Sequence, residues 1–384
     1  MEDGKWQMKN LQRKILGYLV LSLVFAGVYL IRYFMVRHSY LEGSLIRVTG
    51  QISSDPVLYD SQQRIEVGAF RFYVERYPEF QYGEWVEVIG EIGKQERGYQ
   101  EIRGVGEVRK VGDKKNLLYA LRERVLEVYR STLPERHAAL LSGIVLGTKS
   151  SLDSQFFEAL RKTSTLHVVV ASGTNVSLLA GGIMAIFASI IGRRKAIFLT
   201  LSLVWLYVLL VGLQPPIIRA AIMGTIGFVA LGLGRESSAI KALVMSAALM
   251  LLVWPQWLFD LGFQLSFLAT LGVILLSPRI LRLVIPISAD GCQGRPISNG
   301  IREVVAISLG AQIAVAPLLY FNFGEVSLVG PVTNTLVLWT IPMIMLGGFF
   351  LGGFGLFGTF VAQPISWIVW LPLEYFVRVV DLFG

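Results

Sequence analysis

The pattern of hydrophobic and polar positions divides the chain into segments of different character. A polar stretch at 1–14 is followed by a mainly apolar one at 15–36, long enough to cross about 30 Å of hydrocarbon. Between 44 and 112 the pattern alternates with the two-residue period of half-buried strands, as in 64–67. After residue 164 long apolar runs alternate with short polar loops. This pattern predicts a polytopic α-helical membrane protein with a small β domain after its first span.

The apolar runs of the second half set the number of predicted spans. A less regular segment at 364–383 is interrupted by Pro372 and carries Glu374 and Arg378. Counted with 15–36, the clear runs give about nine spans. Those of the multispan domain, 164–384, lie at about 164–191, 196–213, 217–233, 239–254, 258–276, 304–321, 326–345 and 347–362.

The β domain at 44–112 has the length and strand pattern of a small barrel, for which an OB-like fold is the natural candidate. Such barrels often bind single-stranded nucleic acid through basic grooves and aromatic platforms. Between residues 42 and 112, however, nine basic residues stand against twelve acidic ones. We therefore expect this domain alone to bind single-stranded DNA weakly at physiological salt, because that attraction is mainly electrostatic.

Residues 113–163 have an amphipathic pattern. Leu117, Leu121, Val125 and Val128 fall on one helical face, with charged residues beside it. A helix of this kind lies at the membrane surface or packs on the bundle.

Composition and charge agree with this organisation. The chain of 384 residues is 54% hydrophobic and only 16% charged, with a net charge of +8. Soluble domains are about 25% charged. Basic residues gather in every second loop, at 193–195, 235–241 and 279–302, whereas the alternate loops at 214–216, 254–257 and 322–325 carry no Lys or Arg. Positive loops mark the cytoplasmic side. The sequence thus predicts a multi-pass protein of the cytoplasmic membrane, with a cytoplasmic N-terminus at 1–14 and an extracytoplasmic β domain.

Polar and flexible residues interrupt the first long apolar run. The segment 164–191 would form a helix of about 42 Å, longer than the hydrocarbon core. It contains His167, Ser172, Gly173, Thr174 and Asn175. A broken helix is tolerated at membrane depth where it is buried in protein or faces water. The segment therefore either lines a hydrated path or packs helices through small and hydroxyl residues.

Four further polar residues stand inside predicted spans. Arg219 follows Pro215-Pro216 near the end of a span, and ionisable groups there face a cavity or a partner unless they snorkel to the interface. Asp260 and Gln264 are four residues apart and share a helix face. Asp260 is a possible ion-pair partner of Arg219. Asn334 is the last buried polar residue of this kind.

Four motifs resemble the ComEC family of competence proteins. His167–Val176 is similar to the family's histidine and serine-glycine signature, and Pro215–Ala220 resembles its proline-arginine-alanine segment. The run Phe263-Gln264-Leu265-Ser266-Phe267 resembles its F-Q-L-S-F motif, and 317–334 resembles its later loop. The motifs occur in the family's order, and the leading span and β domain match the family's N-terminal part.

The resemblance implies a channel for uptake of single-stranded DNA across the cytoplasmic membrane during transformation, while the other strand is degraded outside. It also implies partners: membrane lipid and separate receptor, ATPase and nuclease proteins. The polar residues named above would then line the DNA path. Asn175 departs from the family motif, which often has a second histidine there.

Several observations bear on enzymatic activity. The chain has one cysteine, Cys292, and three histidines, with no clustered metal motif. Many family members carry a C-terminal metallo-β-lactamase-like domain, but this sequence has no H-x-H-x-D-H run. We therefore expect no metal, no cofactor and no enzymatic activity, with any nuclease supplied by another chain. The competing hypotheses are a secondary transporter or exporter of another polyanion or small solute, and a membrane scaffold whose β domain recruits partners.

Overall fold

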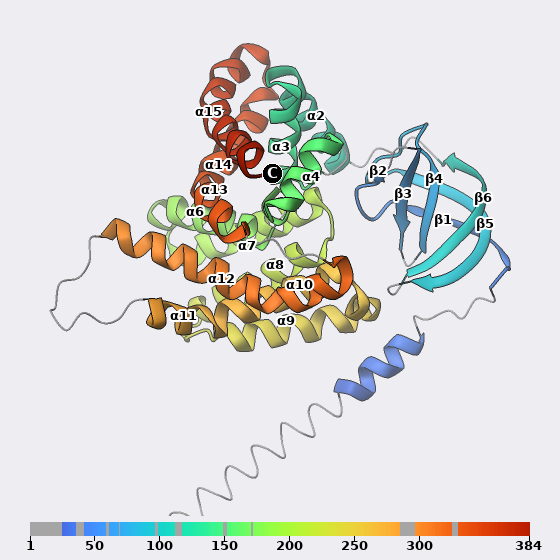
Figure 1. Ribbon diagram of the computed structural model, residues 1–384, viewed down its shortest axis with the longest axis horizontal. Coiled ribbons are helices and arrows are strands. Elements are labelled where there is room, and N and C mark those ends of the chain that lie inside the picture. Colours follow the sequence, from blue (N-terminus) through green and yellow to red (C-terminus); the bar gives the residue numbers. More distant parts are fainter. Residues whose placement is uncertain are drawn as a thin grey trace, which may run out of the picture.

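The computed structural model contains a bundle of helices and a six-stranded sheet domain beside it (Figure 1). It describes residues 25–35, 42–58, 61–68, 70–96, 99–111, 117–148, 152–169, 172–284, 296–324 and 329–384. Half of the predicted span 15–36 falls outside these residues, and its described part is the helix Phe25–Met35. Cys292 also lies outside them.

The sheet domain follows from the two-residue alternation. Its strands are β1 (Leu45–Gln51), β2 (Val57–Leu58), β3 (Gln62–Val67), β4 (Phe70–Glu75), β5 (Trp85–Glu96) and β6 (Tyr99–Lys110), in the order β1-β5-β6-β4-β3-β2. The pairing of β4 with β6 is parallel, and the other described pairs are antiparallel. Alternate residues, such as Ile65, Phe72 and Val88, point into one apolar core.

The helices divide between two apolar cores. One core joins α2 (Leu117–Thr132), α3 (Glu135–Leu146), α4 (Ser154–Lys162), α14 (Ile341–Gly355) and α15 (Thr359–Phe383). The other joins α6 (Gly173–Ile191), α7 (Arg193–Val211), α8 (Pro215–Gly232), α9 (Ala239–Val253) and α10 (Leu261–Leu275). The first core also contains residues of α5 (Leu166–Val169) and α13 (Gly330–Val337), and the second contains Trp257 of η1 (Pro255–Phe259). The other elements are α11 (Ser277–Val284), α12 (Pro296–Phe323) and η2 (Leu338–Thr340).

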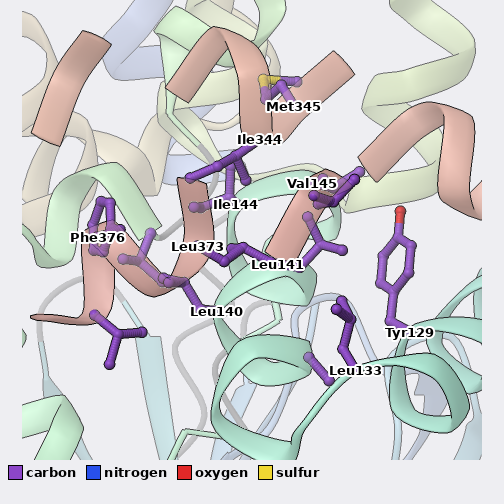
Figure 2. Packing of buried hydrophobic residues seen from close by; sticks show 14 of the residues in the cluster. Tyr129, Leu133, Leu140, Leu141, Ile144, Val145, Ile344, Met345, Leu373 and Phe376 are labelled. Carbon is purple, nitrogen blue, oxygen red and sulfur yellow. The ribbon is translucent and has the colours of Figure 1, made fainter. Parts of the chain in front are cut away.

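Helix α3 is buried inside the bundle. Every residue from His137 to Leu146 is buried. Figure 2 shows Leu140 and Leu141 of α3 packed with Ile344 of α14 and Phe376 of α15. This part of 113–163, which the sequence pattern grouped with interfacial helices, is therefore a core element, because its apolar residues continue around the whole helix.

The described helices do not confirm all nine predicted spans. Among the described residues five helical units are long and apolar enough to cross a membrane, or six if the bent pair α10–α11 counts as one span. The predicted spans 326–345 and 347–362 are wrong as separate elements. Residues Gly330–Gly355 form one unit, and α15 follows as a single helix through Pro364 and Pro372.

Close packing against neighbouring helices accounts for the glycines of α14. A methyl group at Gly348 would lie 2.6 Å from the Val145 side chain of α3, and one at Gly355 would lie 2.3 Å from Val128 of α2. These glycines leave room for neighbouring helices, as small residues do in membrane bundles. Composition alone could not separate this role from a helix break.

The sheet domain contacts one end of the bundle, here named the sheet-facing end. Arg122 of α2 donates to Asp55 over 2.6 Å, and both side chains are almost fully buried. A methyl group at Gly212, just after α7, would lie 3.6 Å from the Tyr82 ring. Trp257, between α9 and α10, hydrogen-bonds to Tyr99. Helix α7 therefore ends, and α8 and α10 begin, beside the sheet, whereas the basic residues at 193–195 begin α7 at the opposite end.

Candidate functional site

The first long apolar run is divided into two helices. Helix α5 ends at Val169, and α6 begins at Gly173 after Ser172, whose backbone is extended with φ −103° and ψ 162°. Helix α6 then runs for 19 residues to Ile191, which is close to the length needed to cross the hydrocarbon core. The polar and flexible residues 172–174 thus stand at the start of this helix rather than in the middle of a longer one.

Asn175 anchors the start of α6 to α3. Its side chain is fully buried, and its Nδ2 donates to the backbone carbonyl of Ile144 over 2.7 Å. The Ser172 hydroxyl donates to Asn175 Oδ1 over 3.1 Å. No side chain caps the first turn of α6, although Ser is a favoured capping residue at this position. The Asn175 side-chain amide therefore holds the start of α6 against α3, whereas Thr174 beside it is exposed.

Arg219 lies against the start of α6. A methyl group at Gly173 would lie 2.8 Å from Arg219 Nη2, so the guanidinium lies against the first residue of the helix. Arg219 Nη1 donates to the carbonyl of Ser266 in α10, and the guanidinium carbon is 5.9 Å from the centre of the Phe267 ring. Arg219 Nε and the Ser266 hydroxyl are buried, and neither has a hydrogen-bond partner among the described residues.

The ion pair considered between Arg219 and Asp260 is absent. Asp260 Oδ1 accepts from the backbone amide of Phe263 over 2.9 Å and caps α10. No carboxylate of the described chain forms an ion pair with Arg219. The aspartate side chain satisfies its own helix start instead, which is a common role for Asp at such a position. Gln264 likewise binds locally, since its Nε2 donates to the Leu258 carbonyl over 2.8 Å.

Asp260 lies toward the sheet domain. Its carboxyl accepts from the Phe263 amide at the start of α10. Glu66 and Arg71 of the sheet domain also act on this carboxyl, in opposite directions. Asp260 thus marks the contact between α10 and the sheet.

His167 and Asn334 belong to a second polar group. His167 is exposed, and its Nδ1 lies 2.7 Å from the carbonyl oxygen of Ser164, to which it donates. Asn334 is 6% exposed, and its Nδ2 is 3.5 Å from the Ser308 hydroxyl of α12. The two sides of this group meet where Thr333 donates to the carbonyl of Thr163 over 2.7 Å.

The structure adds residues that the sequence analysis did not select. Ser266 was visible in the F-Q-L-S-F motif, but nothing in the sequence paired it with Arg219. Thr163 and Thr333 are ordinary hydroxyl residues, and only their contact across 170 positions shows their role. No three His, Cys, Asp or Glu side chains of the described chain gather in a way that could hold a metal ion. The site offers one cation and several hydrogen-bond donors, a set that suits an anion.

The chain is similar to a known protein family and to individual known proteins. A sequence model of the family Competence, described as Competence protein, matches residues 144–384. ComE operon protein 3 of Bacillus subtilis (strain 168) is 26% identical over 259 residues, covering 65% of this chain and 32% of that protein. An uncharacterized protein of Aquifex aeolicus (strain VF5) is 25% identical over 283 residues, covering 73% of this chain and 62% of that protein.

The matched part thus spans about a third of the first relative's length and less than two thirds of the second's. No solved structure matches. The family match covers well over half of the chain, and the motifs around His167, Arg219 and Phe263 lie within it. The chain belongs to the Competence protein family.

Proposed function

We propose that this protein passes single-stranded DNA across the cytoplasmic membrane during natural transformation. Membership of the Competence protein family supports a role in DNA uptake, and the apolar helices support a membrane location. Single-stranded DNA is the proposed substrate. A separate DNA receptor, an ATPase and a nuclease are proposed to act with it, and lipid surrounds its bundle.

The observation that carries the proposal is the environment of Arg219. A guanidinium inside an apolar bundle is unfavourable unless a partner or water compensates its charge. Here the described part of the chain supplies a carbonyl oxygen and an aromatic ring, but no carboxylate. A guanidinium can hold two oxygens of a phosphate through paired hydrogen bonds. Arg219 therefore suits a strand whose backbone carries one phosphate per nucleotide.

We infer that the sheet domain is an OB-like barrel at the entrance. The Ser53 amide, just after the edge strand β1, donates to the Glu66 carbonyl of β3 over 2.9 Å. Strand β3 lies next to the opposite edge of the sheet, so this hydrogen bond brings the two edges together. The domain contacts the bundle where α8 and α10 begin, close to Arg219. Because its charge is acidic, its proposed role is to frame the entrance rather than to bind the strand tightly.

The proposed orientation has Gly68 outside the cell and Arg194 in the cytoplasm. These residues belong to the sheet domain and to the opposite end of the bundle. After replacement of Cys292, a cysteine at position 68 should react with an impermeant thiol reagent in intact cells, and a cysteine at 194 only after permeabilisation. The reverse labelling pattern would overturn the orientation.

Arg219 provides the functional test. Arg219→Gln should lower the entry of labelled DNA at least about tenfold, because a hydrogen bond to a charged group contributes about 1.5–3 kcal/mol. Arg219→Lys should retain part of the uptake, since an ammonium keeps the charge without the paired hydrogen bonds. Membrane level and surface-bound DNA should remain normal.

The matched control is Arg235→Gln, which removes an exposed arginine just beyond the other end of α8. It should leave DNA entry unchanged. Normal entry with Arg219→Gln at normal protein level would contradict the phosphate contact. Normal uptake in cells lacking the whole protein would contradict the proposed function. It would favour the alternatives of a transporter of another solute or a scaffold.

A further inference from the structure

We infer that the first turn of α6, Arg219 and the Ser266 hydroxyl together form an oxyanion site that holds one phosphate group of the passing strand. The inference rests on the proposed function and assigns its phosphate contact to a defined set of donors. Three elements contribute: the amides that begin α6, a guanidinium from α8 and a hydroxyl from α10.

No side chain of the described residues accepts a hydrogen bond from the start of α6. The first amides of any helix have no partner within the helix, and a Ser at the preceding position normally accepts from them. Ser172 instead donates its hydroxyl to Asn175 Oδ1, and Asn175 is held by the Ile144 carbonyl. Because both side chains are engaged elsewhere, the positive end of the α6 dipole is not compensated by a cap.

A cation lies where an anion would be expected. Helix N-termini favour negative groups, yet Arg219 Nη2 would be only 2.8 Å from a methyl group at Gly173. The guanidinium and the helix start therefore repel each other, and no carboxylate of the described chain forms an ion pair with Arg219. An oxyanion between the two positive groups removes this repulsion, as phosphates do at helix N-termini.

An unpartnered hydroxyl provides the independent observation. Ser266 is only 8% exposed, and its hydroxyl has no hydrogen-bond partner among the described residues, although buried polar groups are normally bonded. It belongs to the residue whose carbonyl accepts from Arg219. The Asn175 backbone amide already donates to the Ser172 carbonyl over 3.1 Å, and Arg219 Nη1 donates to the Ser266 carbonyl. The other groups of the site, which are the first amides of α6, Arg219 Nε and the Ser266 hydroxyl, are also donors, so the ligand must present acceptor oxygens, as a phosphodiester does.

Gly173 offers a specific way to disturb the site. A methyl group there would also lie 3.2 Å from Ala220 Cβ, so Gly173→Ala moves Arg219 away from the start of α6 without removing a charge. Gly181, on the same helix, has open space around the equivalent position, and Gly181→Ala is the matched control. Ser266→Ala removes only a hydroxyl that has no hydrogen-bond partner in the described part of the chain, so it should leave folding unchanged.

The experiment measures binding of a fluorescent oligothymidylate to the full chain in detergent at fixed salt. Gly173→Ala should weaken binding about fivefold, and Ser266→Ala two- to threefold, while Gly181→Ala binds normally. In an Arg219→Gln background Gly173→Ala should have no further effect, because both changes act on one site. A methylphosphonate oligothymidylate, which lacks the backbone charge, should bind the wild type and Gly173→Ala equally weakly.

Two competition arms identify the source of the oxyanion. Millimolar inorganic phosphate, or vesicles of anionic lipid, should displace the oligothymidylate only weakly. Strong displacement by either would show that the site binds free phosphate or a lipid headgroup, and would overturn the inference. Normal binding by both Gly173→Ala and Ser266→Ala would also overturn it. If Arg219→Gln alone lowers uptake, the proposed function stands without this site.

Discussion

Asp55→Ala is expected to destabilise the protein by about 3–5 kcal/mol and to release the sheet domain from the bundle. Asp55 and Arg122 form a 2.6 Å ion pair, and their side chains are 9% and 2% exposed. Removing one partner leaves a buried charge without compensation, which is the damaging outcome for such pairs. Among the described residues, Arg122 would keep its contact with the Tyr82 ring at 4.9 Å, a long hydrogen bond to the Leu146 carbonyl and the weaker attraction of Glu123.

Thermal unfolding in detergent and chemical cross-linking between sheet and bundle measure this effect. The double variant Asp55→Leu with Arg122→Met should be less destabilised than Asp55→Ala, because it buries no unpaired charge. Arg47→Ala is the matched control, since Arg47 pairs with Glu87 at 3.4 Å on the exposed surface. Such pairs contribute less than about 1 kcal/mol. Equal unfolding of Asp55→Ala and Arg47→Ala would show that the buried pair does not hold the domains together.

Gly272→Ala is expected to destabilise the contact between α10 and α12 by about 3 kcal/mol. A methyl group at Gly272 would lie 2.4 Å from the Gly310 carbonyl oxygen and 2.5 Å from Ala314 Cβ. The backbones must separate to admit it, and overpacking of this kind typically costs about 1–3 kcal/mol or more. The sign of the change in stability is informative, because inside a helix Ala is otherwise more stable than Gly by about 1 kcal/mol.

The control for this change is Gly224→Ala in α8, where a methyl group meets no atom within 4 Å. Gly224→Ala should leave thermal unfolding unchanged or raise its midpoint, whereas Gly272→Ala should lower it. Because α10 also carries Ser266, the Gly272 variant should lose DNA uptake along with stability. A Gly272→Ala protein as stable as the Gly224→Ala protein would mean that the two helices are not closely packed at this point.

The membrane class, the β domain and the family could be recognised in the sequence because each leaves a local pattern. Long apolar runs indicate helices that cross lipid, and two-residue alternation indicates half-buried strands in the sheet domain. The order of the four motifs indicates the family. The polar residues 172–174 also marked the interruption before α6 correctly. These signals lie within one element or between neighbours in the sequence, so they can be interpreted without knowing the fold.

Partners and boundaries within the bundle were decided only by tertiary structure. Arg219 was matched with Asp260 by charge, yet packing brings it to Ser266 and leaves Asp260 as a helix cap. The glycines near 348 resemble a helix break in composition but accommodate α3. The physical reason is that lipid and a neighbouring helix are equally apolar. The hydrophobicity of a residue therefore indicates that it avoids water, but not whether lipid or another helix contacts it. Contacts between distant segments therefore determined the site, the core position of α3 and the division into helices.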